Sequence, residues 1–436
     1  MRPFGLAVIA ALLLTPLYWW PALAATSPAG ALFSQYLGLW ALIAMGLGQI
    51  IATKLPLIET VFGPMDQSYR LHKWLGIGGF VTVLMHDTID AEITGIPAGA
   101  LADLSETMGD LSLNGLIFFI AVTVLTFIPY NIWKWTHRLI GICFVMGAFH
   151  YLFTQKPFAN TDPLGIYMMV ICGLGTLAYI YTSAPRVVRP FRDYKITKLE
   201  PQSAGMAVDM APAGKPLRHE AGQFAFVSFV GAGLTEPHPF TLSSAPNEDG
   251  TLRVTIAPLG DYTNRVLGRL KDGGAVRVEG PFGRFGRGVR GRQIWVAAGI
   301  GVTPFVALAQ RLRPEDGEVT LILSAKHAAD VPHAAELMAL AAEKANLELV
   351  IWESASRGRL DAAAIAQIAG DLKQAKVLFC GPVPMRKALG AGLRALGVPA
   401  RRYHYEQFEI RTGIGLQWVL NWLWARRDVV LKRGRA

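Results

Sequence analysis

The chain has very few cysteines: three in 436 residues, Cys143, Cys172 and Cys380. They are too few and too far apart for a disulfide framework, and none of their spacings is that of a metal-binding motif. A small protein held together by disulfides is therefore excluded, and the pattern either fits a reducing compartment or places no constraint on the compartment. The chain also lacks internal repeats and low-complexity segments.

Charged side chains are scarce as well, at 17% of the residues, whereas 52% are hydrophobic. Six apolar stretches in the first 182 residues are long enough, or nearly so, to cross a bilayer: 5–23, 32–52, 70–90, 112–131, 135–154 and 164–182. We therefore predict an all-α six-helix transmembrane bundle over residues 1–184. The alternative for the first stretch is a cleaved signal peptide, although Tyr18, Trp19 and Trp20 resemble an interfacial belt and favour a retained helix.

Lysine and arginine are absent from one long loop, Asp87 to Asp110, which holds six acidic residues. Basic residues instead flank the connections on the other side: Lys54, Arg70, Lys73, Lys134, Arg138, Arg186, Arg189 and Arg192. The positive-inside rule places that side, and everything after the sixth stretch, in the cytoplasm of a multi-pass protein of the plasma membrane, here a bacterial inner membrane. Anionic lipid and cofactor phosphates then account for the net charge of +10, and no nucleic-acid partner is expected.

Four histidines occur in pairs inside two of the apolar stretches. His72 and His86 are fourteen residues apart and His137 and His150 are thirteen apart, so each pair spans roughly 20 Å of helix. The two stretches run in the same direction, so His72 lies at the depth of His137 and His86 at the depth of His150. Each level can then supply two axial imidazoles to an iron, which predicts metal ligands for two b-type haems. The alternative is that the histidines are buried or interfacial without a cofactor.

The spacing in the fifth stretch raises a geometric difficulty. Fourteen residues return to nearly the same face of a helix, but thirteen leave the two faces about 140° apart. We therefore expect the fifth helix to tilt, to bulge or to present its two histidines differently. Phe144 and Gly79 lie midway between the two levels, where they pack between the haems or simply in the helix core.

The second half of the chain has a different texture. Alternating stretches such as residues 224–230 and 252–256 predict an antiparallel β-barrel over residues 190–288. Strands, helices and a glycine-rich turn then predict an α/β domain with a parallel sheet over residues 289–411. Residues 412–436 join three tryptophans to basic side chains and predict an amphipathic basic tail, which lies in the membrane interface or packs on the preceding domain.

Short motifs follow one another in this second half. Residues 238–241 read His-Pro-Phe-Thr, 260–263 Gly-Asp-Tyr-Thr, and 280–283 Gly-Pro-Phe-Gly, before a glycine-rich turn at residues 299–304. Each is weak by itself, but their order after the paired histidines resembles the flavocytochrome b superfamily of NADPH oxidases and ferric reductases. In that family the dehydrogenase part is similar to ferredoxin-NADP reductase. The resemblance covers about residues 30–411.

The resemblance implies an FAD site in the predicted barrel. His238, Pro239, Phe240 and Thr241 are expected to line the flavin, with Thr241 bonded to its ring, and Ser244 is expected nearby. Gly260 and Thr263 match the part of the family motif that meets the flavin pyrophosphate. Arg253 and Arg265 are candidates for neutralising phosphate charge, or are ordinary surface arginines.

The resemblance also implies a site for NADPH or NADH. Its expected residues are Gly299, Gly301, Val302, Thr303 and Pro304 at the helix-opening turn, together with Cys380, Gly381 and Pro382 after a later strand. Lys326, His327 and Arg357 favour NADPH by their positive charge. Thr241, Cys380 and the flavin-shielding Phe408 are the expected catalytic residues.

Electron counting completes the prediction. NAD(P)H gives two electrons as a hydride and a haem takes one, so FAD is needed between them. The outer acceptor is then oxygen, giving superoxide, or a ferric or other metal complex. The alternative is a cytochrome b anchor that serves a periplasmic acceptor protein.

Overall fold

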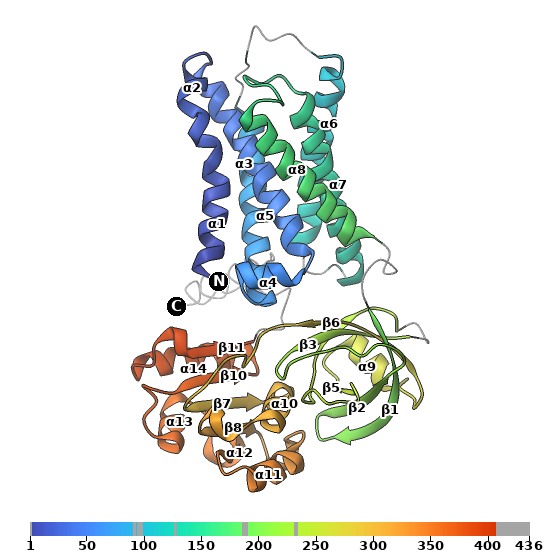
Figure 1. The fold of residues 1–436 in the computed structure, drawn as a ribbon, viewed down its shortest axis with the longest axis vertical. Coiled ribbons are helices and arrows are strands. Elements are labelled where there is room, and N and C mark those ends of the chain that lie inside the picture. The colour runs from blue at the N-terminus through green and yellow to red at the C-terminus, as the bar shows by residue number, and fades with distance from the viewer. Residues whose placement is uncertain are drawn as a thin grey trace, which may run out of the picture. The chain divides into compact units, whose positions relative to one another are not determined.

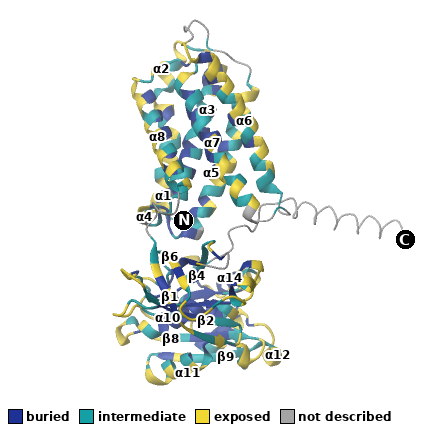
Figure 2. Ribbon diagram, turned by 90° about the vertical axis from the view of Figure 1, so that its right-hand side faces the viewer, coloured by how far each residue is buried: buried dark blue, intermediate teal, exposed yellow. Residues whose placement is uncertain are grey.

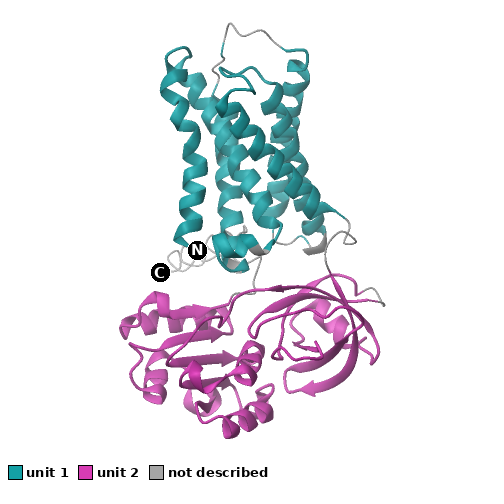
Figure 3. Ribbon diagram, viewed as in Figure 1, with its two compact units in different colours: residues 1–185, 409–436 teal, residues 186–408 magenta. Residues whose placement is uncertain are grey.

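The computed structural model describes residues 2–89, 93, 99–125, 128, 130–184, 191–230 and 234–406, without the side chains of Pro56, Asp66, Tyr130 and Asn131. Figure 1 shows its helices and strands. The chain divides into two compact units, residues 1–185 with 409–436, and residues 186–408 (Figure 3). We call them the helical unit and the sheet unit and describe each by itself.

The helical unit is a bundle of long helices. Its elements are α1 (Pro3–Leu14), η1 (Thr15–Trp19), α2 (Trp20–Ala24), α3 (Ala29–Ala52), α4 (Pro56–Phe62), α5 (Met65–Thr88), α6 (Ala102–Val124), α7 (Tyr130–Phe153) and α8 (Pro163–Ser183). Exposed residues follow the outer sides of these helices (Figure 2) and include large apolar ones such as Trp74, Phe118 and Trp135. An apolar outer surface of this kind suits contact with lipid.

Five stretches of described helix are long and apolar enough to cross a membrane: Pro3–Ala24, Ala29–Ala52, Ala102–Val124, Ile132–Phe153 and Pro163–Ser183. The predicted helical membrane part is thereby confirmed, but its count of six is not. The stretch that falls short is α5, which has 24 residues but carries charges at Arg70 and Lys73. It packs extensively along α3 inside the same bundle, so its membrane crossing stays a prediction.

A proline interrupts the first of these stretches. Pro16 has no N–H to give the preceding turn, and α1 passes into the 3₁₀ turn η1 at this point. Tyr167 of α8 donates its hydroxyl to the Leu12 carbonyl at 2.6 Å, and Tyr36 of α3 donates to the Leu13 carbonyl at 3.1 Å. These two hydrogen bonds tie the interrupted segment to the rest of the bundle.

Helix α6 begins ten residues earlier than the apolar stretch that predicted it, at Ala102 instead of residue 112. The prediction of a loop up to Asp110 was therefore wrong, and Asp103, Glu106 and Asp110 lie on this helix. Its inner face carries the buried Ala102 and Ser105, small residues that a search for apolar runs does not detect. Their spacing with Ser112 and Leu116 follows one face of a helix.

The first part of the sheet unit is an antiparallel sheet of six strands in the order β4-β3-β6-β1-β2-β5. The strands are β1 (Arg192–Gln202), β2 (Gly205–Pro212), β3 (Phe224–Phe229), β4 (His238–Thr241), β5 (Leu252–Ile256) and β6 (Ala275–Phe282), with helix α9 (Asp261–Leu267) after β5. The predicted antiparallel strands are confirmed. Among the described residues the only β-pairing between the two edges is an isolated bridge, Leu242 to Val254, so the predicted closure into a barrel is not confirmed.

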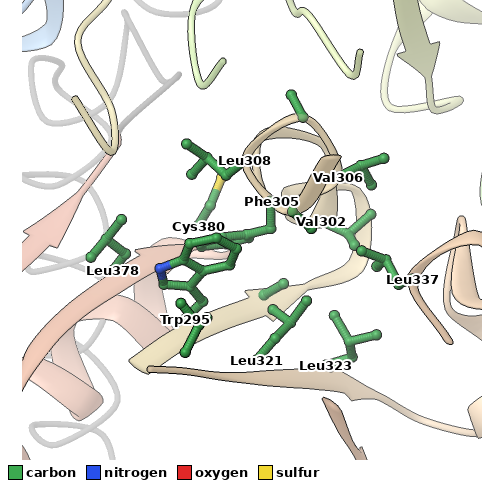
Figure 4. Close-up of a cluster of buried hydrophobic side chains, with 14 of the residues drawn as sticks. Trp295, Val302, Phe305, Val306, Leu308, Leu321, Leu323, Leu337, Leu378 and Cys380 are labelled. Atoms are coloured by element: carbon green, nitrogen blue, oxygen red, sulfur yellow. The ribbon is translucent and has the colours of Figure 1, made fainter. Parts of the chain in front are cut away.

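The second part of the sheet unit is a parallel sheet, as predicted, and its strand order is β11-β10-β7-β8-β9. It comprises β7 (Gln293–Ala298), β8 (Val319–Ala325), β9 (Leu347–Glu353), β10 (Lys376–Cys380) and β11 (Tyr403–Tyr405), with helices α10 (Thr303–Arg311), α11 (Ala334–Glu343), α12 (Ser354–Arg357), α13 (Ala362–Ala369) and α14 (Val383–Ala395). The strand order reverses between β7 and β10, the place where open α/β sheets bind nucleotides. Figure 4 shows Trp295, Phe305 and Cys380 in the core beside it.

Candidate functional site

Two of the four histidines meet inside the helical unit. The ring centroids of His72 on α5 and His137 on α7 are 6.1 Å apart. His72 Nδ1 lies 2.9 Å from the Gly48 carbonyl of α3, and His137 Nδ1 lies 3.4 Å from the Thr123 hydroxyl of α6. When Nδ1–H donates to an oxygen, the lone pair of the imidazole is on Nε2, the nitrogen that is then free to bind a metal.

The other two histidines line one cavity of about 210 Å³. His86 Nδ1 lies 2.8 Å from the Ser34 carbonyl, and His150 Nδ1 lies 2.9 Å from the Ser105 carbonyl. Backbone carbonyls therefore orient both rings and favour the tautomer with its lone pair on Nε2. The predicted pairing by depth, His72 with His137 and His86 with His150, corresponds to these two meeting places.

The two histidine rings of α7 lie in different surroundings. This is one of the three arrangements that we expected from their spacing of thirteen residues. The helix is continuous from Tyr130 to Phe153, so no bulge realigns them. His137 stacks on Trp133 at 5.2 Å between centroids, whereas the His150 ring lies against α6. Thr123 and Ser105, their partners on α6, are eighteen residues or five turns apart and hence on one face of that helix.

Glycines allow the close approach of the rings. A Cβ at Gly109 of α6 would lie 2.8 Å from His150 Nδ1, too close for a real atom, whereas one at Gly38 of α3 would lie 3.4 Å from His86 Nε2, in ordinary contact. Phe144, almost fully buried, lines the cavity of His86 and His150. Gly79 instead packs against Met45 and Ala41 of α3.

In the sheet unit, two of the motifs are in direct contact. His238 of β4 stacks on Tyr262 of α9, with 3.5 Å between the ring centroids and an angle of 18° between the planes. Tyr262 donates its hydroxyl to the Glu236 carbonyl at 2.8 Å, which fixes the pair. Thr241, at the end of the same strand, pairs with Phe224 of β3 and is buried. Tyr262 lies within the Gly-Asp-Tyr-Thr motif, but no role of its own was predicted for it from the sequence.

The residues expected near the flavin phosphates follow β4 or lie on β5 and around α9. Several of their side chains are already engaged in hydrogen bonds or ion pairs within the protein. Thr263 Oγ1 accepts the Gly260 and Leu259 N–H groups at 3.1 and 3.0 Å and so closes the start of α9. Ser244 Oγ accepts the Arg253 N–H at 3.0 Å. The Arg253 guanidinium is bound to Glu336 at 2.8 Å, and Arg265 donates to the Asp261 carbonyl of its own helix at 3.2 Å.

The two nucleotide motifs meet at the reversal point of the parallel sheet. Gly299 has a φ of +57°, a left-handed conformation that suits glycine. A Cβ at Gly301 would overlap the Cys380 carbonyl, so only glycine allows this turn to rest on the end of β10. Val302, Thr303 and Pro304 are buried at the start of α10. Gly381 and Pro382 lead from β10 into α14.

Cys380 and Glu406 lie close together at this edge. Burial, together with the charge of Glu406, raises the pKa of the Cys380 thiol well above its ordinary value, so the thiol is neutral. A Cβ at Gly283 would lie 3.2 Å from Glu406 Oε1, which places Glu406 beside both the Gly-Pro-Phe-Gly motif and Cys380. The sequence did not single out Glu406, although it is two residues before Phe408. Phe408 and residues 412–436, the predicted shield and tail, lie outside the described residues.

The three candidates for recognising NADPH follow strands β8 and β9. Lys326 accepts the Ala355 N–H at its carbonyl at 3.1 Å, which joins the ends of the two strands. The His327 N–H is bound by Asp330, and Arg357 lies over the Trp352 ring at 5.4 Å. The three residues therefore follow the carboxyl ends of the neighbouring parallel strands β8 and β9.

Comparison with known families agrees with this division of the chain. Residues 37–148 match the ferric reductase like transmembrane component, residues 195–285 match an FAD-binding domain, and residues 295–390 match an oxidoreductase NAD-binding domain.

Several curated proteins resemble the chain. The stachydrine N-demethylase reductase subunit Stc4 of Rhizobium meliloti (strain 1021) is 28% identical over 47% of this chain and 62% of its own. The flavohemoprotein of Chromobacterium violaceum is 28% identical over 52% of this chain and 61% of its own. Human dual oxidase 2 is 24% identical over 57% of this chain and 18% of its own. The chain thus spans about 60% of the first two relatives.

Among solved structures, flavohemoglobin from Malassezia yamatoensis has a TM-score of 0.50 at 17% identity, covering 86% of this chain and 99% of its own. At this identity the likeness concerns the fold alone.

Proposed function

We propose that this chain, which joins a ferric reductase-like transmembrane component to FAD-binding and NAD-binding domains as the flavocytochrome b superfamily does, carries electrons from cytoplasmic NAD(P)H to an acceptor outside the membrane. Its class is that of a membrane NAD(P)H-dependent oxidoreductase. The proposed carriers are one FAD and two b-type haems.

The orientation of the four histidines carries the proposal. All four have Nδ1 near an oxygen of a neighbouring helix: Gly48, Thr123, Ser34 and Ser105. Nε2 is thereby left as the ligand nitrogen at two levels, and Gly38 and Gly109 leave room beside the rings. These residues fit haem, with His72 and His137 holding one group and His86 and His150 the other. Bound there, haem would supply reversible one-electron transfer inside the bilayer.

The sheet unit fits FAD and a nicotinamide nucleotide. The flavin is proposed to lie along His238, Pro239, Phe240 and Thr241, with Ser244, Gly260 and Thr263 near its phosphates. The turn Gly299 to Pro304 offers backbone N–H groups and a helix start to the pyrophosphate of NAD(P)H. Bound FAD would accept a hydride and release its electrons one at a time.

Two further residues are proposed to arrange the hydride transfer. Cys380, a neutral thiol at the end of β10, would pack beside the nicotinamide without adding charge. Phe408 is proposed to cover the flavin until the nicotinamide displaces it, because both rings need the same face. Lys326, His327 and Arg357 support NADPH as the preferred donor.

The cavity of His86 and His150 also suggests the class of acceptor. Its lining, as far as the structure describes the chain, includes the carboxylates Asp87, Glu106 and Asp110 and no lysine or arginine. Negative charge favours the approach of cations and supports a ferric or other metal complex over oxygen. The second candidate acceptor is a periplasmic protein, for which the chain would act as a cytochrome b anchor.

The experiment is to purify the full-length protein, count its haem and FAD, and measure NADPH and NADH consumption with ferric chelates and with oxygen. The proposal expects reduction of at least one of these acceptors. Nucleotide oxidation by FAD without any reduction of haem would contradict it.

A further inference from the structure

A network of buried and half-buried polar side chains joins the antiparallel sheet to the parallel sheet within the sheet unit. Its centre is Glu336 in the first turn of α11, and its other members are Arg253 and Thr255 of β5, Gln310 of α10 and His333. Of these five residues, only Arg253 was given a role by the sequence, as a candidate for neutralising phosphate charge.

Glu336 receives three hydrogen bonds from three separate segments. Oε1 accepts from Arg253 Nη2 at 2.8 Å and from Gln310 Nε2 at 2.6 Å, and Oε2 lies 3.2 Å from His333 Nδ1. Burial acts to raise the pKa of Glu336, but these hydrogen bonds and the charge of Arg253 outweigh it and lower the pKa to about 2. The group is therefore a carboxylate at every physiological pH.

His333 adds further hydrogen bonds between the network and the antiparallel sheet. Its Nε2 lies 2.8 Å from the Thr255 hydroxyl, which lies 3.0 Å from the Ser243 hydroxyl. The backbone N–H of His333 donates to Gln202 Oε1 at 2.9 Å. His333 is 5% exposed and has a φ of +58°, a conformation that costs energy in a residue other than glycine. Contacts on all sides hold it there.

The segments that the network joins are those that carry the two nucleotide sites. Arg253 donates to the Ser243 carbonyl at 2.8 Å, two residues after Thr241, and the Ala245 N–H donates to Gln310 Oε1 at 2.6 Å. Gln310 lies near the end of α10, the helix that opens at the turn of Gly299 and Gly301. The network thus connects the end of β4, where the flavin is proposed to bind, with α10, which follows the proposed NAD(P)H-binding turn.

We infer that Glu336 is a positioning residue for hydride transfer: through Arg253, Gln310 and His333 it sets the distance and angle at which the nicotinamide meets the flavin. The inference rests on the proposed transfer from NAD(P)H to FAD. Hydride transfer is sensitive to this geometry, and a displacement of about 1 Å can cost on the order of a hundredfold in rate. The affinity for the nucleotide depends on contacts within the parallel-sheet part, so replacing Glu336 leaves it nearly unchanged.

The test compares the full-length protein with Glu336→Gln and with Arg253→Met, each mixed with NADPH in a stopped-flow instrument without oxygen. NADPH must first reduce the flavin of the wild-type protein. If it does not, the proposed function itself is refuted, and not only the role of Glu336. For both variants we expect the limiting rate of flavin reduction to fall by about tenfold or more, with a change in the apparent Kd for NADPH of less than about threefold. The charge-transfer absorbance between nicotinamide and flavin should fall in parallel.

A second measurement keeps the inference open to refutation if the variants lose FAD. Hydrogen exchange of the peptide that contains Ala245 should be faster in Glu336→Gln, because an amide oxygen at position 336 is a weaker acceptor than a carboxylate and holds the Gln310 side chain, which accepts this N–H, less firmly. The control is Glu315→Gln, which removes an exposed carboxylate 3.7 Å from Arg313 and should change none of these quantities. Unchanged limiting rates and charge-transfer absorbance in Glu336→Gln, or unchanged exchange at Ala245, would overturn the inference.

Discussion

Ser105 of α6 and His150 of α7 are joined by two reciprocal hydrogen bonds. The His150 ring lies 2.9 Å from the Ser105 carbonyl, and the Ser105 hydroxyl donates to the His150 carbonyl at 3.2 Å. Ser34 and His86 repeat the arrangement, with distances of 2.8 and 3.1 Å. Both histidines of this cavity are therefore fixed in orientation by a serine of a neighbouring helix, as ligands of a large planar cofactor need to be.

Replacing either histidine of the cavity should remove one haem and no more. We expect His86→Ala and His150→Ala to halve the haem content while reduction of FAD by NADPH proceeds, because the part of the chain that matches an FAD-binding domain lies in the sheet unit. A pyridine haemochrome assay normalised to FAD measures this. His404→Ala, a change in β11, is the control and should keep the full haem content; a full content in His86→Ala would remove that residue from the ligands.

Gly109→Ala should disturb the haem proposed to lie between His86 and His150 without replacing either of these histidines. The new methyl group would lie 2.8 Å from His150 Nδ1, so the ring must rotate or α6 must move away from α7. We expect loss or altered spin state of one haem in electron paramagnetic resonance spectra. The matched control is Gly76→Ala on α5, where a Cβ has no neighbour within 4 Å. Equal spectra for the two variants would show that the contact has no influence on the haem.

A fragment that begins at Arg189 should bind FAD and oxidise NAD(P)H with an artificial acceptor, because both nucleotide motifs lie within it. Flavin absorbance after gel filtration and ferricyanide reduction are the measurements. A folded fragment without flavin would refute the assignment of the FAD site.

Phe408→Ala should raise the apparent affinity for NAD(P)H and narrow the preference between NADH and NADPH, since both nicotinamides then reach an uncovered flavin. Stopped-flow flavin reduction at varied nucleotide concentration measures both effects. Truncation after Arg411 is the companion variant, and slow reduction in it would assign the basic tail to the active site. No change in Phe408→Ala would move the shielding role to another residue.

The pKa of Glu336 predicts how acid affects the sheet unit. A carboxyl group whose pKa falls from 4.5 to about 2 on folding adds stability that is present above pH 4.5 and is lost as the pH falls towards 2. The difference in unfolding free energy between wild type and Glu336→Gln should therefore be constant above pH 5 and shrink below pH 4. Urea unfolding of the Arg189 fragment at several pH values tests this, and a difference that grows on acidification would contradict it.

The sequence was informative where a side chain itself carries the signal. The pairing of His72 with His137 and of His86 with His150 was predicted from spacing alone, and the predicted glycine-rich turn lies beside Cys380 at one end of the parallel sheet. The start of α6 was not found, because its inner face is made of Ala102, Ser105 and Gly109 rather than large apolar residues.

Other features depend on the fold and leave no trace in a single sequence. Ser34 and Ser105 orient the histidines through backbone carbonyls, which every residue possesses. Arg253 was a candidate for binding phosphate, yet its guanidinium is bound to Glu336, 83 residues further along the chain. Only the packing of α11 against β5 brings this partner into reach.

The central claim is that NADPH reduces two haems through FAD, and anaerobic mixing of purified full-length protein with NADPH tests it most directly. Flavin and haem absorbance are followed together, with a pyridine haemochrome assay giving the haem count. The account predicts two low-spin haems for each FAD and reduction of both after the flavin. One haem or none for each FAD, or a flavin that is reduced while both haems stay ferric, would contradict it.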